Sequence, residues 1–271
     1  MSRTWFITGT SRGFGREWAA AALGRGDKIV GTARDTSTTG DLAASYPGTF
    51  LALPLDVTDR AACFAAVKLA RDHFGDLDIV VNNAGYGHFG MVEEVSEKEA
   101  RDQIETNLFG ALWVTQAALP YLRERGAGHI VQVSSIGGIS AFPSVGLYHA
   151  SKWGLEGFSQ ALAQEVKPFG INVTLIEPGG FSTDWAGSSA KRSEPIHVYD
   201  ELREAVQKMQ SGNPGGNPAA SAAALLRIVD AEEPPRRCFF GTEPIHVAEA
   251  DYASRLETWR AWQPVAELAQ G

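Results

Sequence analysis

The sequence predicts an α/β fold, in which one doubly wound parallel sheet of about seven strands carries helices on both faces. Short apolar runs alternate with longer amphipathic stretches through the first half of the chain, and this alternation is typical of such a sheet. The length of 271 residues also suits one large core, since α/β folds reach about 250 residues as a single domain. The expected strands are Trp5–Thr8, Lys28–Thr32, Phe50–Leu55, Ile79–Asn82, Ile130–Ser134 and Ile171–Glu177, with a weaker seventh at Cys238–Phe240.

Amphipathic stretches between these runs predict the helices. Asp59 is expected to cap one helix, because apolar residues follow it at steps of three and four and form one buried stripe. A longer helix is expected from about Glu97 to Arg125, and Pro120 should end or kink it. Residues 1–271 are expected to form one domain, and the segment Ser211–Pro218 is interpreted as a mobile loop between two short helices.

Composition excludes several classes of function. The net charge of -8 argues against a surface that binds nucleic acid or anionic lipid. No apolar stretch approaches the ~20 residues of a membrane-spanning helix, and a strand pattern begins too early to leave room for a signal peptide. We therefore expect a cytoplasmic location. Cys63 and Cys238 are too few for a disulfide framework or a multi-cysteine zinc site, and we expect reduced packing residues.

A glycine-rich turn follows the first expected strand. The segment Thr8–Gly15 reads TGTSRGFG, and a helical pattern begins directly after it. Glycines allow the backbone to approach a phosphate closely, and the amides at a helix start favour its charge. A glycine triplet is also compatible with an ordinary turn, but its place between a strand and a helix favours nucleotide binding.

Two arginines predict which dinucleotide binds. Arg34 stands at the end of the second strand, and Arg12 lies in the glycine turn. Basic side chains at these positions can accept the 2′-phosphate of NADP, which favours NADP(H) over NAD(H). Two alternatives remain open: both arginines are solvated surface residues, or Asp35 neutralises Arg34.

A tyrosine and a lysine lie one helical turn apart at Tyr148 and Lys152. A tyrosine has an ordinary pKa of about 10, and a nearby ammonium group favours its ionised form. Tyr148 is therefore a candidate general acid or base at neutral pH, although such a pair is often a surface pair. Ser135 follows the fifth strand, where its hydroxyl can bond a substrate oxygen. A buried Asn107 amide can bond helix carbonyl groups and hold a water beside Lys152.

Together these segments resemble the short-chain dehydrogenase/reductase family over about residues 4 to 185. The similarity is closest to the branch that contains estrogenic 17β-hydroxysteroid and retinol dehydrogenases, through Ser135–Pro143 and Phe158–Gly170. The matching motifs are Thr8–Gly15, Leu55–Val57, Asn82–Gly85, Asn107, Ser135, Tyr148–Lys152 and Pro178–Thr183. The order and spacing of these motifs follow the family pattern.

The resemblance implies a Rossmann-type domain that transfers a hydride at a nicotinamide without a metal. It implies a catalytic tetrad of Asn107, Ser135, Tyr148 and Lys152. Tyr148 would act as acid or base, Ser135 would orient the substrate oxygen, and Lys152 would tune Tyr148 and bind the nicotinamide ribose. The implied cofactor-binding residues are Gly9, Ser11, Arg12, Gly13, Phe14, Gly15, Arg34, Asp56, Val57, Asn83, Ala84, Gly85, Tyr148, Lys152, Pro178, Gly179, Phe181 and Thr183.

The resemblance also implies where the substrate binds. The expected pocket residues are Ile139, Phe142, Val145, Phe181 and Trp185, with His88 and Phe89 from another loop, although each is also a plausible core residue. Such a pocket suits a hydrophobic carbonyl compound or secondary alcohol. Residues 184–218 would form a lid, and residues 243–271 a helical extension that packs over the lid or contacts another subunit. His149 is expected to pack against neighbours, and Glu243, His246 and Glu249 to form a solvated helix face without a metal.

Homo-oligomerisation, as a dimer or a tetramer, is expected through Leu108–Arg123 and Ser151–Phe169. The leading hypothesis is an NADP-dependent oxidoreductase that interconverts a carbonyl group and a secondary alcohol. The alternative is a catalytically silent protein that binds NADP(H) as a sensor. Sensors of this kind usually lack part of the tetrad, and this chain has all four residues, which favours the enzyme.

Overall fold

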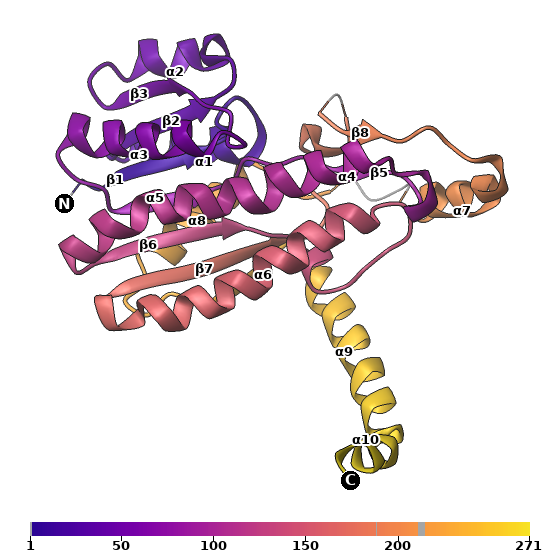
Figure 1. The fold of residues 1–271 in the computed structure, drawn as a ribbon. Helices are drawn as coiled ribbons and strands as arrows, with labels where there is room; N and C mark the ends of the chain where they lie inside the picture. The colour runs from indigo at the N-terminus through magenta and orange to yellow at the C-terminus, as the bar shows by residue number, and fades with distance from the viewer. Residues whose placement is uncertain (1, 188, 211–214) are drawn as a thin grey trace.

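The main feature of the fold is a sheet of seven parallel strands in the order β3-β2-β1-β4-β6-β7-β9 (Figure 1). A computed structural model describes residues 2–187, 189–210 and 215–271. The strands are β1 (Thr4–Thr8), β2 (Lys28–Ala33), β3 (Phe50–Pro54), β4 (Ile79–Asn82), β6 (Gly128–Val133), β7 (Ile171–Pro178) and β9 (Arg237–Phe240). The seven strands expected from the sequence are all present, with small shifts at their ends, and the α/β class is confirmed.

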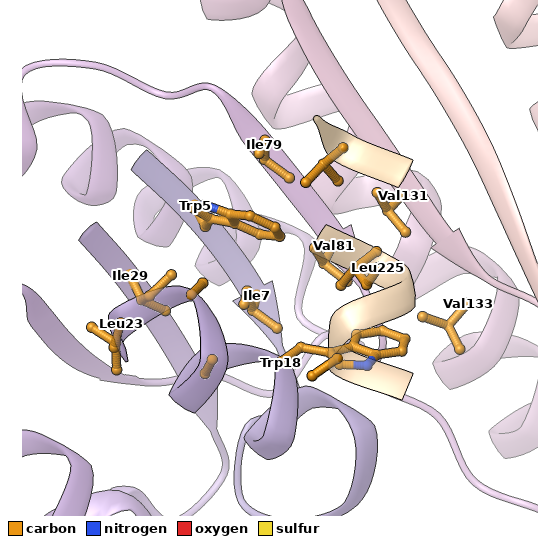
Figure 2. Packing of buried hydrophobic residues seen from close by; sticks show 14 of the residues in the cluster. Trp5, Ile7, Trp18, Leu23, Ile29, Ile79, Val81, Val131, Val133 and Leu225 are labelled. Atoms are coloured by element: carbon orange, nitrogen blue, oxygen red, sulfur yellow. The ribbon is translucent and has the colours of Figure 1, made fainter. Parts of the chain in front are cut away.

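Two hydrophobic cores lie on opposite faces of this sheet. The helices are α1 (Gly13–Gly24), α2 (Gly40–Ser45), α3 (Arg60–Phe74), α4 (Glu97–Ile104), α5 (Gly110–Arg125), α6 (Gly146–Val166), α7 (Asp200–Gln210), α8 (Ala220–Val229), α9 (Pro244–Ala261) and α10 (Gln263–Gln270). Trp5 and Ile7 of β1 belong to the core with α1 and α8, whereas Phe6 belongs to the core with α3, α5 and α6. Figure 2 shows the first core, where Trp18 and Leu225 lie near β1. Burial on both faces explains why the strands are continuous apolar runs.

The expected long helix from Glu97 is interrupted, but not at Pro120. A π-helical turn, Glu105–Phe109, separates α4 from α5, and α5 continues through Pro120 to Arg125. Pro120 therefore does not end the helix, which was one of the two alternatives, and the other, a kink at Pro120, stays a prediction. Pro120 and Gln116, whose carbonyl loses its helical donor, are both exposed, so solvent can satisfy that carbonyl. The prediction for Asp59 is confirmed, since its carboxylate accepts a hydrogen bond from Ala62 N at 3.0 Å.

The strand order places the ligand crevice. Chain connections lead from β1 outward to β2 and β3 on one side, and to β4, β6, β7 and β9 on the other. Loops that follow β1 and β4 therefore diverge at the carboxyl edge of the sheet, which is where open α/β sheets bind their ligands. The predicted site residues come from segments that follow β1, β2, β3, β4, β6 and β7, and they meet at this edge.

The two C-terminal helices leave the sheet and project away from α7 (Figure 1). Trp259 and Trp262 are 59% and 64% exposed. The middle of α9 is held to the loop after β6 by Asp251, which accepts a hydrogen bond from Ser140 Oγ at 2.9 Å, and by Arg255, which donates to the Ile139 carbonyl at 3.0 Å. The apolar residues of this segment are exposed and do not pack over the lid in this chain, so contact with another subunit, the other alternative, stays a prediction.

Three other sequence expectations concern the same part of the chain. The segment Ser211–Pro218 lies between α7 and α8, as expected, but residues 211–214 lie outside the described residues. Within the described part of the chain, no helix is both long and apolar enough to cross a membrane. Cys63 is buried and Cys238 is half-buried, and both are free thiols.

Candidate active site

The glycine turn between β1 and α1 requires glycine at Gly9, Gly13 and Gly15. Gly9 and Gly13 have φ angles of 72° and 59°, a region that favours glycine. A Cβ atom at Gly15 would lie 2.5 Å from both the Gly9 carbonyl oxygen and Asn83 Nδ2. The turn is thus an open backbone cradle at the start of a helix, and it fits the pyrophosphate of a dinucleotide.

Asn83 and Thr8 hold this cradle in place. The Asn83 side-chain amide donates to the Thr8 and Gly9 carbonyls at 2.9 and 3.0 Å. In return, the Thr8 hydroxyl accepts from the backbone amides of Asn83 and Ala84, both at 3.0 Å. These bonds tie the loop after β4 to the loop after β1, so the two loops form one rigid wall of the crevice.

The two arginines expected to choose the cofactor have different environments. Arg34 is exposed, and no carboxylate among the described residues forms an ion pair with it. Asp35 does not neutralise Arg34, because its carboxylate accepts from Ser37 N at 2.9 Å. Arg12 Nη1, in contrast, lies 2.5 Å from Asp184 Oδ2. The structure therefore directs Arg12 to the segment after β7.

Asp56 and Val57 follow β3, and the structure separates them. The Asp56 carboxylate is exposed and accepts from the amide and hydroxyl of Thr58 at 3.0 and 2.8 Å. Val57 is buried, and a Cβ atom at Gly110 would lie 2.6 Å from Val57 Cγ2. Of these two residues, only Asp56 has an exposed side chain at the end of β3.

The loop after β7 lies against the glycine turn. A Cβ atom at Gly13 would lie 3.7 Å from Thr183 Cγ2, so Thr183 is beside the start of α1. The Phe181 ring packs edge-on against Phe14, with 4.9 Å between ring centres, and Phe14 stacks on Trp18 at 5.1 Å. Phe181 thus belongs to the packing under the glycine turn and does not line the substrate side.

Pro178 and Gly179 fix the start of this loop. Pro178 is the last residue of β7, and Gly179 N donates to the Phe240 carbonyl at 2.9 Å. A Cβ atom at Gly179 would lie 2.9 Å from Pro244 Cγ. Close packing against α9 therefore requires glycine here and holds the loop in the crevice wall.

Tyr148, Lys152 and Ser135 meet at the carboxyl edge of β6. Tyr148 and Lys152 lie one turn apart on α6 and are 7% and 6% exposed. The Ser135 hydroxyl hydrogen-bonds the Tyr148 phenol and accepts from Gly137 N at 3.0 Å. Lys152 Nζ lies 5.7 Å from the centre of the Tyr148 ring and donates to the Val133 carbonyl at 2.7 Å.

Burial controls the pKa values of both groups in this structure. Burial raises the pKa of Tyr148 to about 12, while the hydrogen bond from Ser135 lowers it by less. Burial also lowers the pKa of Lys152 to about 8, against the attraction of Glu156. The sequence predicts a lowered tyrosine pKa, and the structure gives the opposite direction, because the Lys152 ammonium bonds Val133 and the phenol has left water.

Asn107 lies in the π-helical turn between α4 and α5, and it is 1% exposed. Its amide donates to the Tyr86 carbonyl and to Ser151 Oγ at 3.0 and 3.2 Å, and its oxygen accepts from Tyr86 N at 3.0 Å. A Cβ atom at Gly85 would lie 3.1 Å from Asn107 Oδ1 and 3.8 Å from Lys152 Nζ. Asn107 thus lies near Lys152, but it clamps the Gly85–Tyr86 backbone where the sequence predicts bonds to helix carbonyls.

His149 braces the loop that carries Ser135. Its Nδ1 lies 2.9 Å from the Gly137 carbonyl, and its Nε2 accepts from Phe142 N at 2.9 Å. These bonds require a proton on Nδ1 of a neutral ring. Burial lowers the pKa of His149, which is consistent with that form. His149 fixes the position of Ser135 and has no contact that suggests acid or base chemistry.

An apolar patch faces the Tyr148 ring. Trp185 packs edge-on against Tyr148, with 5.0 Å between ring centres, and against Phe89 at 5.1 Å. Ile139 and Val145 are buried, whereas Phe142 is 40% exposed and packs on His149. The structure therefore brings Trp185 and Phe89 to the predicted substrate side.

The segment after Trp185 is held by His88 and Phe89, which the sequence assigned to the substrate pocket, and by Glu94 and Arg203, which the sequence did not single out. Strand β8 (Lys191–Arg192) pairs with β5 (His88–Phe89), and His88 Nε2 lies 2.8 Å from Ser193 Oγ. The fully buried Glu94 carboxylate accepts from Ile196 N at 2.8 Å and from Arg203 Nη2 at 2.7 Å. His88 thus anchors this segment, and Glu94 and Arg203, far apart in the chain, give no local signal of their contact.

Known proteins are similar to this chain in sequence and in fold. The family model for short chain dehydrogenases matches residues 3–194. An oxidoreductase of Botryotinia fuckeliana is 41% identical over 92% of both chains. A crystal structure of a short-chain dehydrogenase from Streptomyces avermitilis has a TM-score of 0.92 and 38% identity, over 98% of both chains.

An alcohol dehydrogenase from the archaeon Thermococcus sibiricus, solved with 5-hydroxy-NADP, has a TM-score of 0.75 and 25% identity. That match covers 89% of this chain and 96% of the archaeal chain. Sequence and structure therefore agree that this chain belongs to the short-chain dehydrogenase family of oxidoreductases, whose fold binds a nicotinamide dinucleotide.

Proposed function

We propose that the protein is an NADP(H)-dependent oxidoreductase that interconverts a carbonyl group and a secondary alcohol on a hydrophobic small molecule. One observation carries the proposal: the Tyr148 phenol, the Ser135 hydroxyl and the buried Lys152 ammonium meet where β6 ends. All three lie beside an apolar patch on one side and a phosphate cradle on the other. An acid, a hydrogen-bond donor and a cation in this arrangement suit reduction of a carbonyl.

Tyr148 is the acid in reduction and the base in oxidation. Its phenol donates a proton to the substrate oxygen as that oxygen becomes an alkoxide, and the Ser135 hydroxyl orients the same oxygen. The Lys152 ammonium stabilises the phenolate that remains. Asn107 supports the proton route by fixing the loop beside Lys152.

The nicotinamide cofactor supplies the hydride in reduction and accepts it in oxidation when it is bound. The cradle of Gly9, Ser11, Gly13, Phe14 and Gly15 holds its pyrophosphate. Asp56 would hold the adenine, Lys152 the nicotinamide ribose, and Thr183 the carboxamide. The residues that form the walls are Val57, Asn83, Ala84, Gly85, Pro178, Gly179 and Phe181.

Arg34 selects NADP(H) over NAD(H). Its guanidinium is exposed at the end of β2, without a carboxylate partner among the described residues, so it is available for a 2′-phosphate. Arg12 is engaged with Asp184, and its contribution is to hold the segment after β7 against the glycine turn. The cofactor choice therefore depends mainly on Arg34.

The substrate is apolar around its carbonyl group. Trp185 and Phe89 provide aromatic surfaces beside Tyr148, as a steroid-like or long-chain ketone requires. Of the expected lid, residues 184–218, the described parts 184–187, 189–210 and 215–218 lie over this surface in the proposal. Copies of the chain pair through α5 and α6, where Trp153 of α6 is 40% exposed and Phe169, in the turn just after α6, is 44% exposed.

The test measures the oxidation of NADPH and of NADH, by loss of absorbance, with a panel of hydrophobic ketones, aldehydes, steroids and quinones. Turnover that is faster with NADPH than with NADH is the expected result. Tight NADPH binding without turnover of any compound would instead favour the sensor. Failure to bind either cofactor would overturn the proposal, because every assigned role depends on the phosphate cradle.

A further inference from the structure

Three ionisable side chains follow one another along one face of α6. Tyr148, Lys152 and Glu156 are each separated by one helical turn, so their side chains point the same way. Lys152 and Glu156 are each 6% exposed. A buried carboxylate therefore stands directly behind the buried ammonium on which the proposed reaction depends.

Glu156 shares its burial with a second carboxyl group. Glu177 of β7 is 1% exposed, and it forms a hydrogen bond with Glu156. Two carboxyl groups can share a hydrogen bond only if one of them keeps its proton. Arg237 of β9 is their cation, with Nε at 3.0 Å from Glu156 Oε2 and 3.3 Å from Glu177 Oε1.

The carboxyl pair is packed against the loop that carries Ser135. A Cβ atom at Gly138 would lie 2.7 Å from Ser134 Oγ and 3.0 Å from Glu156 Cγ. Ser134 Oγ is buried and has no hydrogen-bond partner among the described residues. No contact of either carboxyl group reaches the phosphate cradle or the apolar patch, so the roles assigned above leave this pair unused.

We propose that Glu156, with Glu177 as its proton-sharing partner, is a positioning residue that keeps the Lys152 ammonium charged during acid–base chemistry at Tyr148. The inference rests on the proposed function. Glu156 raises the pKa of Lys152, against the burial that lowers it. Burial, and then the charge of Glu156, raises the pKa of Glu177 to about 8.

The pair therefore responds to pH in the range where Lys152 loses its proton. As pH rises through about 8, Glu177 ionises and no longer shares a proton with Glu156, whose charge lies next to Lys152 on α6. That charge makes the Lys152 proton harder to remove. The other charged or titratable groups that face the pair are Arg237 and the Cys238 thiol, both on β9, and Tyr148 faces Lys152 along α6.

The experiment compares Glu156→Gln with Glu177→Gln. Each variant removes one carboxyl group from the same buried pair and leaves the other with Arg237, so the two are matched in packing. Glu156→Gln removes the charge next to Lys152. Glu177→Gln instead fixes that charge on Glu156, because no partner remains to share a proton with it.

The first readout is the titration of Lys152 followed by NMR, in protein labelled with ¹³C at the lysine Cε. It needs no turnover and no cofactor. A Tyr148→Phe background keeps the phenol from titrating. We expect the Lys152 pKa to fall by about one unit in Glu156→Gln and to stay the same or rise in Glu177→Gln. We also expect the titration with both carboxyl groups present to be broader than a one-proton curve.

The second readout is the pH dependence of kcat/KM with Tyr148 present. Removing a negative charge lowers the affinity of the Tyr148–Lys152 pair for its protons. The alkaline limb of the kcat/KM profile therefore moves to lower pH in Glu156→Gln, and it does not in Glu177→Gln. Equal shifts of the Lys152 pKa and of the alkaline limb in both variants, or no shift in Glu156→Gln, would overturn the inference. Glu156 would then have only a structural role. If Glu156→Gln does not fold, the NMR titration of Lys152 in the protein with both carboxyl groups still tests the inference. A titration curve that fits a single proton would overturn the inference. An NMR shift in a protein without turnover would instead refute the proposed function.

Discussion

The glycine turn and the segment after Trp185 form two walls of the candidate active site, but they are built differently. The turn is held by backbone groups of adjacent strands, which Asn83 and Thr8 join through four hydrogen bonds of 2.9–3.0 Å. The segment after Trp185 is held by a two-residue strand pair and by the Glu94–Arg203 ion pair, whose members come from distant parts of the chain.

This difference separates a general function from a particular one. A dinucleotide has the same phosphates in every enzyme that binds it, so its cradle can be rigid and made of backbone. Substrates differ, and side-chain contacts between distant segments can change without disturbing the sheet. We therefore expect changes in the glycine turn to abolish cofactor binding, and changes near Glu94 to alter only how substrate binds.

The largest effect is expected from Gly15→Ala. The added methyl group would collide with the Gly9 carbonyl and force the cradle open. Lost hydrogen bonds to the charged pyrophosphate cost about 1.5–3 kcal/mol each, so we expect the affinity for NADPH to fall by about a hundredfold. Fluorescence titration with NADPH should show that loss. Gly157→Ala is the matched control, because nothing lies within 4 Å of its added Cβ atom. Equal affinity in the two variants would mean that the cradle does not bind the cofactor.

A smaller and more selective effect is expected from Arg34→Asp. Loss of a charge-assisted contact should weaken NADPH binding by about 10- to 100-fold and leave NADH binding nearly unchanged. Arg12→Ser is the comparison, since it breaks the pair with Asp184 and should weaken both cofactors to a similar extent. Dissociation constants for both cofactors check this. If Arg34→Asp weakens both equally, Arg34 has a structural role.

The smallest effect is expected from Arg203→Ala. Without Arg203, the buried Glu94 carboxylate loses its only cationic partner among the described residues, so the segment after Trp185 should loosen. We expect KM for a hydrophobic ketone to rise about tenfold, by roughly the free energy of a charged hydrogen bond, with cofactor affinity unchanged. Arg101→Ala is the control, since its pair with Glu97 is exposed. A parallel loss of cofactor affinity would contradict the division between the two walls.

The difference between local patterns and contacts of distant segments also determines which features can be predicted from the sequence. The strands, the Asp59 cap and the glycine turn depend on local patterns of apolar residues, caps and glycines, and the sequence identifies them. Three of the tetrad residues, Ser135, Tyr148 and Lys152, also follow a strand end or a helical repeat, so their meeting point follows from the topology. The π-helical turn at Asn107 has no such pattern, and Pro120 gave a misleading signal because its exposure depends on the tertiary structure.

Contacts between distant side chains are the part that the sequence does not reveal. Neither the Arg12–Asp184 pair nor the Glu94–Arg203 pair follows from spacing. Phe181 was assigned to the substrate pocket as well as the cofactor site, yet it packs on Phe14. The direction of the Tyr148 pKa also required the structure, because it depends on burial and on where Lys152 directs its ammonium group.

Tyr148→Phe tests the central claim most directly. The variant lacks only the phenolic oxygen, so the packing of the ring against Trp185 should persist. The measurement is turnover of a ketone substrate and NADPH affinity on the same preparation. We predict a loss of turnover of about a thousandfold with unchanged cofactor affinity, which is the contribution of a general acid. Turnover within about tenfold of the unmodified protein would show that Tyr148 is not the proton donor.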